Sequence, residues 1–290
     1  MAGRPKGASL ARLLAGTWIV ACACKPATEE GTAAATYGNV SYGSDSAQVM
    51  DVFLPAGRGT STPVVVFVHG GGWSGGDKSI FTSTDIGKFT SAGYACVNIN
   101  YRLADNSRNI HDPVLSNDVT AALDYIAAHA SQYQVSATTF AMVGHSAGAH
   151  LSLLASYRYD PAHRIKAVAT LSGPTDLTDS TFLAVGGIPA TIETYLGVTL
   201  AAAPARWTAA SPLSVATVTS APTIILQGAV DALVPAVEGA KLDVRLTALG
   251  VAHGYHLYPT YNHDLNYGVL LHFPDDVWNP VLAWFATYVR

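Results

Sequence analysis

The chain has 290 residues and a formal net charge of −4, and 12% of its residues are charged, against about 25% in a typical globular domain. This length suits one catalytic domain with a single core. The body of the chain has no run of Lys or Arg, so nucleic acid is not an expected partner and a small neutral substrate fits better.

The N-terminus has the pattern of an export signal. Three basic residues among the first twelve precede an apolar stretch at residues 13–21, which is too short to span a bilayer but has the length of a signal-peptide core. Residues 1–24 are therefore expected to be a signal peptide or lipoprotein leader. Ile-Val-Ala before Cys22 resembles a lipoprotein box, which makes lipidation of Cys22 or Cys24 a hypothesis, whereas Ala-Cys-Ala resembles a cleavage site. We expect a protein that is periplasmic, secreted or lipid-anchored to a bacterial membrane; the alternative is a frayed end.

The next segment, residues 25–36, is small, polar and aperiodic, which is typical of a flexible tether. The catalytic domain is expected at residues 37–290. Its first part, residues 37–54, alternates in short stretches around a Gly and Ser break, which predicts an antiparallel hairpin.

Beyond the hairpin, apolar strands alternate with helical patterns, which predicts a mostly parallel sheet with helices on both faces. Cys96 stands alone inside one apolar run and is expected to be a small buried hydrophobic residue. Residues 176–212, rich in Gly, Ala, Thr and Pro, break the alternation and predict a small insertion that caps a site. The expected strands are 64–68, 94–99, 139–143, 166–171, 223–226 and 253–258. The expected helices are 80–92, 113–130, 147–157, 236–249 and 276–289.

A G-x-S-x-G motif, residues 144–148, lies between the strand at 139–143 and the helix that follows. This strand-turn-helix context is what gives the motif its meaning as a nucleophile turn. The turn is so tight that a side chain at Gly144 or Gly148 would collide with neighbouring backbone, and the strain lifts the hydroxyl of Ser146 clear. Ser146 is therefore the candidate nucleophile.

His69 and the three glycines after it end the strand at 64–68. Glycines after a strand leave backbone N–H groups free of neighbouring side chains, and such donors stabilise a tetrahedral oxyanion. A flexible glycine loop is the alternative reading. The combination with Ser146, two strands later, favours the oxyanion hole.

A serine nucleophile needs a base, and His263 is the best candidate because it follows the last strand in a loop that can cover the top of the sheet. His145 and His150 lie beside the serine in sequence, but their rings are expected to point sideways or into helix packing. Asp231, just past the strand at 223–226, is the expected acid and gives the chain order Ser146, Asp231, His263.

Two other carboxylates, Asp176 and Asp179, are alternative acids in the loop after the preceding strand. Asp118 is expected to anchor backbone or a neighbouring basic residue. No zinc, calcium or phosphate-binding motif occurs, so neither a metal nor a cofactor is expected.

Several segments resemble the bacterial hormone-sensitive-lipase-like esterases of the α/β-hydrolase fold, and more closely their bidomain-feruloyl-esterase-like branch of carboxylesterases. The resemblance covers nearly the whole chain after residue 37. The segments that carry it are Tyr42, MDVFLP at 50–55, HGGGW at 69–73, NYRL at 100–103, GHSAG at 144–148, ASP at 210–212 and DALVP at 231–235. It implies an oxyanion hole formed by the N–H groups of Gly71, Gly72 and Ala147.

The sequence departs from the family pattern beside the acid and the base. Gln227, Gly228 and Ala229 stand where the family usually has His-Gly-Thr, and Asp264 follows His263 in place of Gly. Loops beside the acid and base shape the pocket, so these departures leave the substrate open.

Three aromatic residues, Trp73, Tyr101 and Trp207, are candidates to line an acyl or alcohol pocket; the alternative is that they pack in the core.

The function expected from these residues is that of a serine carboxylesterase that hydrolyses small or short-acyl esters through an acyl-enzyme. Feruloyl or acetyl esters of plant polysaccharide are possible substrates. The alternatives are arylformamidase activity like that of kynurenine formamidases, which look similar around residues 69–73, an exopeptidase of the prolyl-oligopeptidase kind, and a catalytically silent binding protein. The oligomeric state stays open, as does the choice between ester and formamide.

Overall fold

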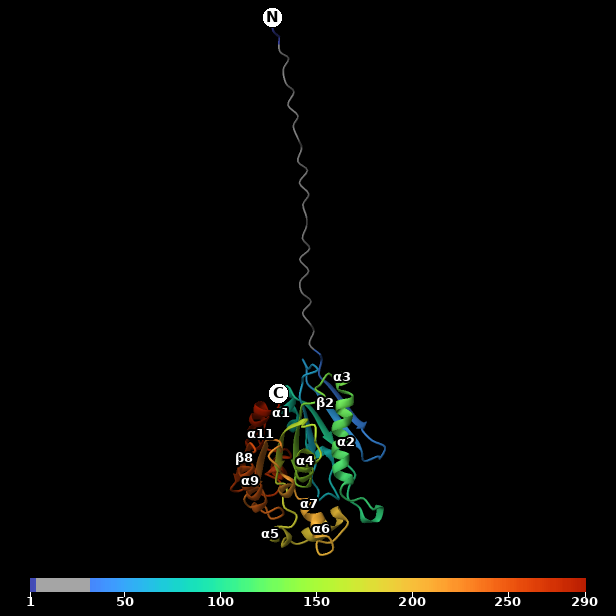
Figure 1. Ribbon diagram of the computed structural model, residues 1–290, viewed down its shortest axis with the longest axis vertical. Coiled ribbons are helices and arrows are strands. Elements are labelled where there is room, and N and C mark those ends of the chain that lie inside the picture. The colour runs from blue at the N-terminus through green and yellow to red at the C-terminus, as the bar shows by residue number, and fades with distance from the viewer. Residues whose placement is uncertain (4–31) are drawn as a thin grey trace. The chain divides into compact units, whose positions relative to one another are not determined.

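The computed structural model describes residues 1–3 and 32–290 (Figure 1). The expected leader cleavage site, the candidate lipidation sites Cys22 and Cys24, and most of the expected tether lie outside the described residues. The folded domain begins with β1 (Ala35–Ser41), slightly ahead of the expected start at residue 37. Within the described residues, no helix has the length and hydropathy required to cross a bilayer.

Eight strands of the described chain form one sheet in the order β1-β2-β4-β3-β5-β6-β7-β8. The antiparallel strand is β2, which pairs with β1 and β4, and all the other neighbours are parallel. The remaining bounds are β2 Val49–Leu54, β3 Val64–Val68, β4 Ala95–Ile99, β5 Phe140–His145, β6 Ile165–Leu171, β7 Thr223–Gly228 and β8 His253–Tyr258. The mostly parallel sheet and the entry hairpin are as predicted.

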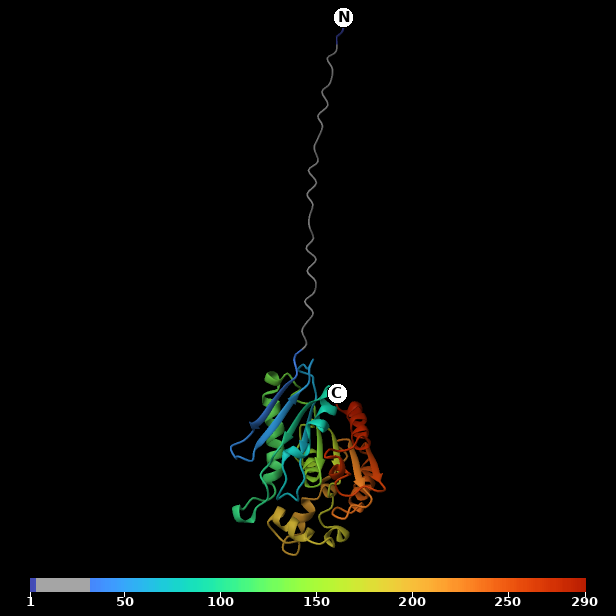
Figure 2. The same ribbon diagram turned by 180° about the vertical axis from the view of Figure 1, so that it is seen from behind.

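Helices cover both faces of the sheet (Figures 1 and 2). One face packs on α2 (Val114–Ala128), α4 (Ala147–Arg158) and α9 (Val237–Leu249), and the other on α1 (Ser83–Ser91) and α11 (Asp275–Tyr288). Alternate residues of a strand serve the two faces: Val66 belongs to the first core and Phe67 to the second. This is why the central strands read as continuous apolar runs.

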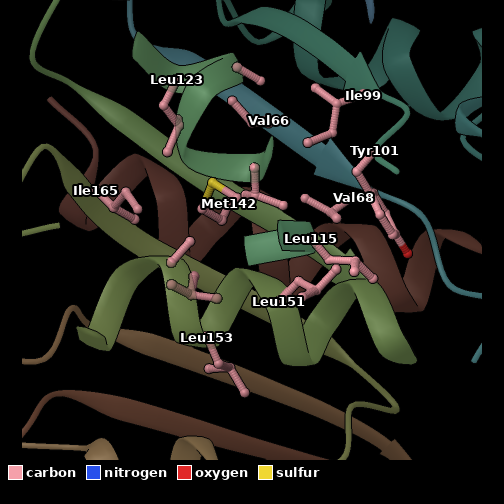
Figure 3. Close-up of a cluster of buried hydrophobic side chains, with 14 of the residues drawn as sticks. Val66, Val68, Ile99, Tyr101, Leu115, Leu123, Met142, Leu151, Leu153 and Ile165 are labelled. Carbon is pink, nitrogen blue, oxygen red and sulfur yellow. The ribbon is translucent and has the colours of Figure 1, made fainter. Parts of the chain in front are cut away.

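Leu151 of α4 lies in the first core with Met142 of β5 and Val68 of β3 (Figure 3). The helix that starts at the candidate nucleophile is therefore fixed against the central strands by buried apolar side chains, each of which stabilises the fold by about 1.5–3 kcal/mol. This packing fixes the position of Ser146 at the start of α4.

The segment expected to be an insertion, residues 176–212, holds short helices between β6 and β7. The labelled helices of this segment lie together at one end of the body in Figure 1. The helices of four to six residues are too short to show a helical period in the sequence, whereas the nine-residue helix has apolar residues at 188, 192, 195 and 196, which is helical spacing. Their bounds are α5 Ser180–Leu183, α6 Ile188–Leu196, α7 Pro204–Ala209 and α8 Pro212–Val215. The other short elements are η1 Lys78–Ile80, η2 Asn106–Arg108, α3 Ala130–Tyr133 and α10 Tyr267–Leu270.

The sheet brings four loops to one edge. Val68 at the end of β3 pairs with Gly144 of β5, so the glycine run and the serine turn are neighbours. Gly228 at the end of β7 pairs with Tyr258 of β8, so the loops that carry the candidate acid and base are also neighbours. Ligands of open α/β sheets bind at this carboxyl edge.

Candidate active site

Ser146 occupies the tight turn between β5 and α4. Its backbone has φ 53° and ψ −122°, a conformation that costs free energy for any residue other than glycine. A Cβ at Gly144 would lie 2.3 Å from the carbonyl oxygen of Gly148, and a Cβ at Gly148 would lie 2.1 Å from that of Val68. Both flanking positions therefore require glycine, as the motif predicts.

Three predicted residues come together at this turn. The Ser146 hydroxyl donates to His263 Nε2 at 2.9 Å, and His263 Nδ1 donates to Asp231 Oδ2, also at 2.9 Å. The Asp231 side chain is fully buried. The His263 side chain is 17% exposed to solvent and lines the cleft. The arrangement is that of a nucleophile, a base and an orienting carboxylate.

The buried carboxylate of Asp231 is held by further donors. Its Oδ1 accepts the N–H groups of Leu233 and Val234, both at 2.9 Å, and its Oδ2 accepts Gln227 Nε2 at 3.1 Å. Gln227 also donates to the carbonyl oxygen of Val234 at 2.9 Å. In the sequence, Gln227 stood out only as a departure from the family pattern. Its position near the end of β7, shortly before Asp231, was the one signal that it could contact the acid.

The His145 ring lies between the serine turn and the base loop. Its Nε2 donates to the backbone oxygen of His263 at 3.1 Å, and the two rings are 5.1 Å apart. Burial, together with the nearby His263 imidazole, lowers the pKa of His145 to about 4. His145 is therefore neutral at pH 7, and its hydrogen bond goes to the backbone of the base loop and not to the serine hydroxyl.

The glycine run lies against the serine turn. Gly71 and Gly72 have φ 114° and 57°, and a Cβ at Gly71 would lie 2.3 Å from the Gly75 oxygen. Within the described residues neither N–H group has a protein acceptor. Ala147 is the first residue of α4, where an N–H group has no acceptor inside the helix. All three predicted oxyanion donors are thus available to a ligand.

A cleft of about 410 Å³ opens above Ser146, next to the glycine run. Its apolar walls are Ile80 and Leu233, and the carboxylates of Asp77 and Asp264 also face it. Hydrogen bonds from Asn100 and Ser79 outweigh the effect of burial and lower the pKa of Asp77 to about 2. No Lys or Arg occurs among the described residues that line this cleft, so its charge disfavours anionic ligands.

A second cleft of about 390 Å³ lies beside β2 and α1, away from Ser146. Its described lining has hydroxyl and apolar groups but no base or acid. Of these two clefts, only the one at Ser146 contains a nucleophile with a base.

The expectation for the three candidate pocket aromatics is corrected by the structure. Trp73, Tyr101 and Trp207 are all buried and do not line the cleft. Each polar tip finds an acceptor inside the protein: Tyr101 donates to the His69 oxygen at 2.9 Å, and Trp207 donates to that of Val198 at 3.1 Å. A buried aromatic with a satisfied polar tip is a core residue, which was the alternative reading.

The other candidate carboxylates lie in ion pairs. Asp176 and Asp179 both pair with Lys241, and Asp118 accepts three N–H groups of Arg102, as an anchoring role predicts. The described residues contain no group of three or more His, Cys, Asp or Glu side chains placed to hold a metal ion.

Known proteins resemble this chain in sequence and in fold. Esterase LipC of Mycobacterium tuberculosis is 27% identical over 250 residues, which cover 75% of this chain and 59% of LipC. Kynurenine formamidase of Drosophila melanogaster is 34% identical over 116 residues, 40% of this chain and 36% of the formamidase. This chain thus spans less than two thirds of either relative. A solved truncated form of carbohydrate esterase from gut microbiota superposes with a TM-score of 0.76 at 19% identity, covering 89% of this chain and 97% of that one.

The structural likeness shows that the fold is that of the α/β-hydrolases. The family model described as BD-FAE matches residues 50–246, a range that contains the glycine run, Ser146 and Asp231. Both the fold and this match agree with the resemblance stated above. The chain belongs to the BD-FAE family of α/β-hydrolases.

Proposed function

We propose that this protein is a serine carboxylesterase that hydrolyses small, neutral, short-acyl esters. The observation that carries the proposal is the hydrogen-bonded series from Ser146 through His263 to the buried Asp231 at the floor of a cleft. Free backbone donors of the glycine run lie beside it. The relatives named as esterases support the same reaction.

In the first step, His263 Nε2 takes the hydroxyl proton as Ser146 Oγ attacks the ester carbonyl carbon. The carbonyl oxygen becomes an oxyanion that accepts the N–H groups of Gly71, Gly72 and Ala147. Asp231 holds the imidazole in the tautomer that carries its proton on Nδ1 and stabilises the imidazolium. His263 then returns the proton to the alcohol oxygen as the C–O bond breaks, which leaves the acyl group on Ser146.

In the second step, water takes the place of the alcohol. His263 accepts a proton from the water as its oxygen attacks the acyl carbon, and the same N–H groups hold the second oxyanion. Return of the proton to Ser146 Oγ releases the carboxylic acid. No cofactor takes part in either step.

The cleft itself supports the substrate class. Its modest volume and short apolar walls suit a small acyl group, and its two carboxylates repel an anionic substrate. Acetyl esters of polysaccharide fit both properties, whereas feruloyl esters share the neutral charge but carry a larger acyl group. A fold relative is named as a carbohydrate esterase.

Formamide hydrolysis is the second candidate because kynurenine formamidases of three animals are among the curated relatives. The same nucleophile, base and oxyanion donors serve both bonds, so the site geometry does not separate them. Rates on N-formylkynurenine and on acetyl, butyryl, octanoyl and feruloyl esters, measured side by side, would decide between the two.

The test of the proposed function is Ser146→Ala. The variant should lose turnover of p-nitrophenyl acetate and butyrate by more than about 10³-fold and should lose labelling by a fluorophosphonate. Ser91→Ala is the matched control, because Ser91 lines the second cleft and its loss should change neither property. Full turnover by the Ser146 variant would refute the proposal, and absence of turnover and labelling in the wild type would favour a silent binding protein.

We also propose that the protein is exported through its N-terminal leader and anchored by a lipid on Cys22 or Cys24. The support is the basic and apolar pattern before Cys22. Metabolic labelling with a palmitate analogue should mark the wild type and be lost in Cys22→Ala, or in Cys24→Ala if that residue is the anchor. An unlabelled wild type would end the lipid proposal.

A further inference from the structure

The glycine run continues into Trp73, whose backbone conformation is unusual for its residue type. We call residues 69–73 the oxyanion loop. Gly71, Gly72 and Trp73 all have positive φ, and that of Trp73 is 60°. A bulky residue seldom adopts this conformation, which persists only where surrounding structure enforces it. The direction of the Gly71 and Gly72 N–H groups therefore depends on what holds Trp73.

The Trp73 indole is held on two sides in the interior. Its ring stacks on Tyr195 with centroids 4.8 Å apart and planes 16° apart, and it meets the His150 ring edge-on at 5.2 Å. Its Nε1–H donates to His150 Nδ1 at 3.3 Å. We call Trp73, His150 and Tyr195 the aromatic brace.

The hydrogen bonds of His150 fix its tautomer. His150 Nε2 donates to the carbonyl oxygen of Ala210 at 2.8 Å, so Nδ1 carries the lone pair that accepts the indole N–H. Burial lowers the pKa of His150 to about 4, so the ring is neutral at pH 7 and this acceptor is kept. His150 stands one helical turn after Ser146 in α4, which ties the oxyanion loop to the helix that begins at the nucleophile.

Helix α6 of the insertion completes the support. Tyr195 is fully buried, and its hydroxyl donates to Asp112 Oδ1 at 2.9 Å. Thr191 lies one turn earlier on the same face of α6, and its Cγ2 is 3.2 Å from the position of a Cβ at Gly72. The insertion thus packs on Trp73 and leaves little space for a side chain at Gly72.

We propose that His150 is a positioning residue for the oxyanion hole: by accepting the Trp73 indole N–H, it fixes the loop so that the Gly71 and Gly72 N–H groups point at the reacting carbonyl oxygen. This proposal rests on the proposed esterase function and adds a residue to it. The His150 side chain does not line the cleft at Ser146, and its ring is hydrogen-bonded to Trp73 and Ala210 and not to a side chain of the triad. Its effect is transmitted through Trp73.

The test uses Trp73→Phe, His150→Phe and the double variant. Trp73→Phe keeps an aromatic ring beside Tyr195 and removes the N–H donor together with part of the indole volume. The matched control is Trp207→Phe, which removes an equally buried indole N–H whose acceptor is Val198. Three quantities are measured: kcat per site titrated with a fluorophosphonate, KM for p-nitrophenyl acetate, and Ki of a short alkyl boronic acid that forms a tetrahedral adduct with serine.

Each single variant should lower kcat per titrated site about tenfold and raise the boronate Ki by a similar factor, with KM changed by less than about twofold. The double variant should have about the same kcat per titrated site as the less active single variant, because both changes remove the same hydrogen bond. His150→Asn, which places an amide oxygen near the position of Nδ1, should recover most of the loss. Trp207→Phe should match the wild type.

Wild-type kcat per titrated site in both single variants would overturn the proposal. So would a lower titrated fraction with normal kcat per site, since that result means a structural role only. Should His150→Phe not fold, Trp73→Phe decides by itself. Failure of the proposed function would appear differently, as a wild type without Ser146-dependent turnover. In that case the dissociation constant of the boronate, measured by direct binding, would still report on the brace.

Discussion

The two sides of Ser146 are built differently. On the relay side, Asp231 and His263 stand on two loops at the ends of β7 and β8, and directed hydrogen bonds from Gln227 and backbone N–H groups hold the acid. On the oxyanion side, Trp73 is held mainly by buried aromatic packing against α4 and α6. One side moves protons, whereas the other only presents fixed dipoles.

Because the two sides differ in this way, variants on each side should affect kcat and its pH dependence differently. Changes on the relay side alter which groups carry protons, so they should change the shape of the pH–rate profile. Changes on the oxyanion side reorient backbone donors that do not titrate, so they should lower kcat by the same factor at every pH. The three predictions below test the relay side and then the junction between the sides.

The largest effect is expected from Asp231→Asn. An amide cannot hold the His263 Nδ1 proton as the carboxylate does, so kcat should fall by about 10³–10⁴-fold with an altered pH–rate profile. Asp179→Asn, at one of the alternative acids, should keep kcat within about threefold of the wild type. Steady-state kinetics on p-nitrophenyl butyrate from pH 5 to 9 measure both. A larger loss in the Asp179 variant would reassign the acid.

A smaller effect is expected from Gln227→Leu. The change removes one of the two donors to Asp231 Oδ2, leaving His263 as its remaining donor, and leaves the Val234 oxygen without its side-chain partner. We therefore expect kcat to fall about tenfold and the free energy of unfolding to fall by about 1–3 kcal/mol. Gln227→Glu should be worse, because a second carboxylate would face Asp231. Steady-state kinetics and urea unfolding of the two variants provide the test. A Gln227→Leu variant with the same kcat as the wild type would show that Gln227 does not support the acid.

The smallest effect is expected on the pH dependence of Tm, and it concerns the contact between Glu238 of α9 and the start of the insertion. Glu238 of α9 is fully buried and accepts the N–H groups of Thr175 and Asp176, both at 2.7 Å, so it ties the start of the insertion to the helix after the acid loop. Burial, with a further contribution from Asp176 and Asp179, raises the pKa of Glu238 from 4.5 to about 7. Lys241, which pairs with both aspartates, is the cation that faces this cluster.

The sign of the pH dependence follows from this shift. Between pH 4.5 and about pH 7 the folded protein keeps a proton that the unfolded chain releases, so the contribution of Glu238 to stability falls as pH rises through this range. Glu238→Gln keeps an acceptor and does not ionise. Its Tm relative to the wild type should therefore rise by about 5 °C from pH 5 to pH 8. Glu193→Gln on α6 is the control, and parallel Tm curves for wild type and Glu238→Gln would contradict the prediction.

The amino-acid sequence determined the parts of the site that depend on local signals. The glycines at 144 and 148 are required by the turn itself, and Ser146, Asp231 and His263 each follow a recognisable strand. Because parallel strands end at one edge of the sheet, their chain order was enough to bring the three side chains together.

Only the tertiary structure decided the supports of the site. From the sequence, Trp73 was a candidate either to line a pocket or to pack in the core. Its ring turns inward because Tyr195, from a helix distant in the chain, provides a stacking surface. The position of the His150 ring was also decided by the tertiary structure, because its hydrogen-bond partners are Trp73 of the oxyanion loop and Ala210. Whether an aromatic ring faces a cleft or the core depends on contacts between residues far apart in the chain, and these form only when the whole fold packs.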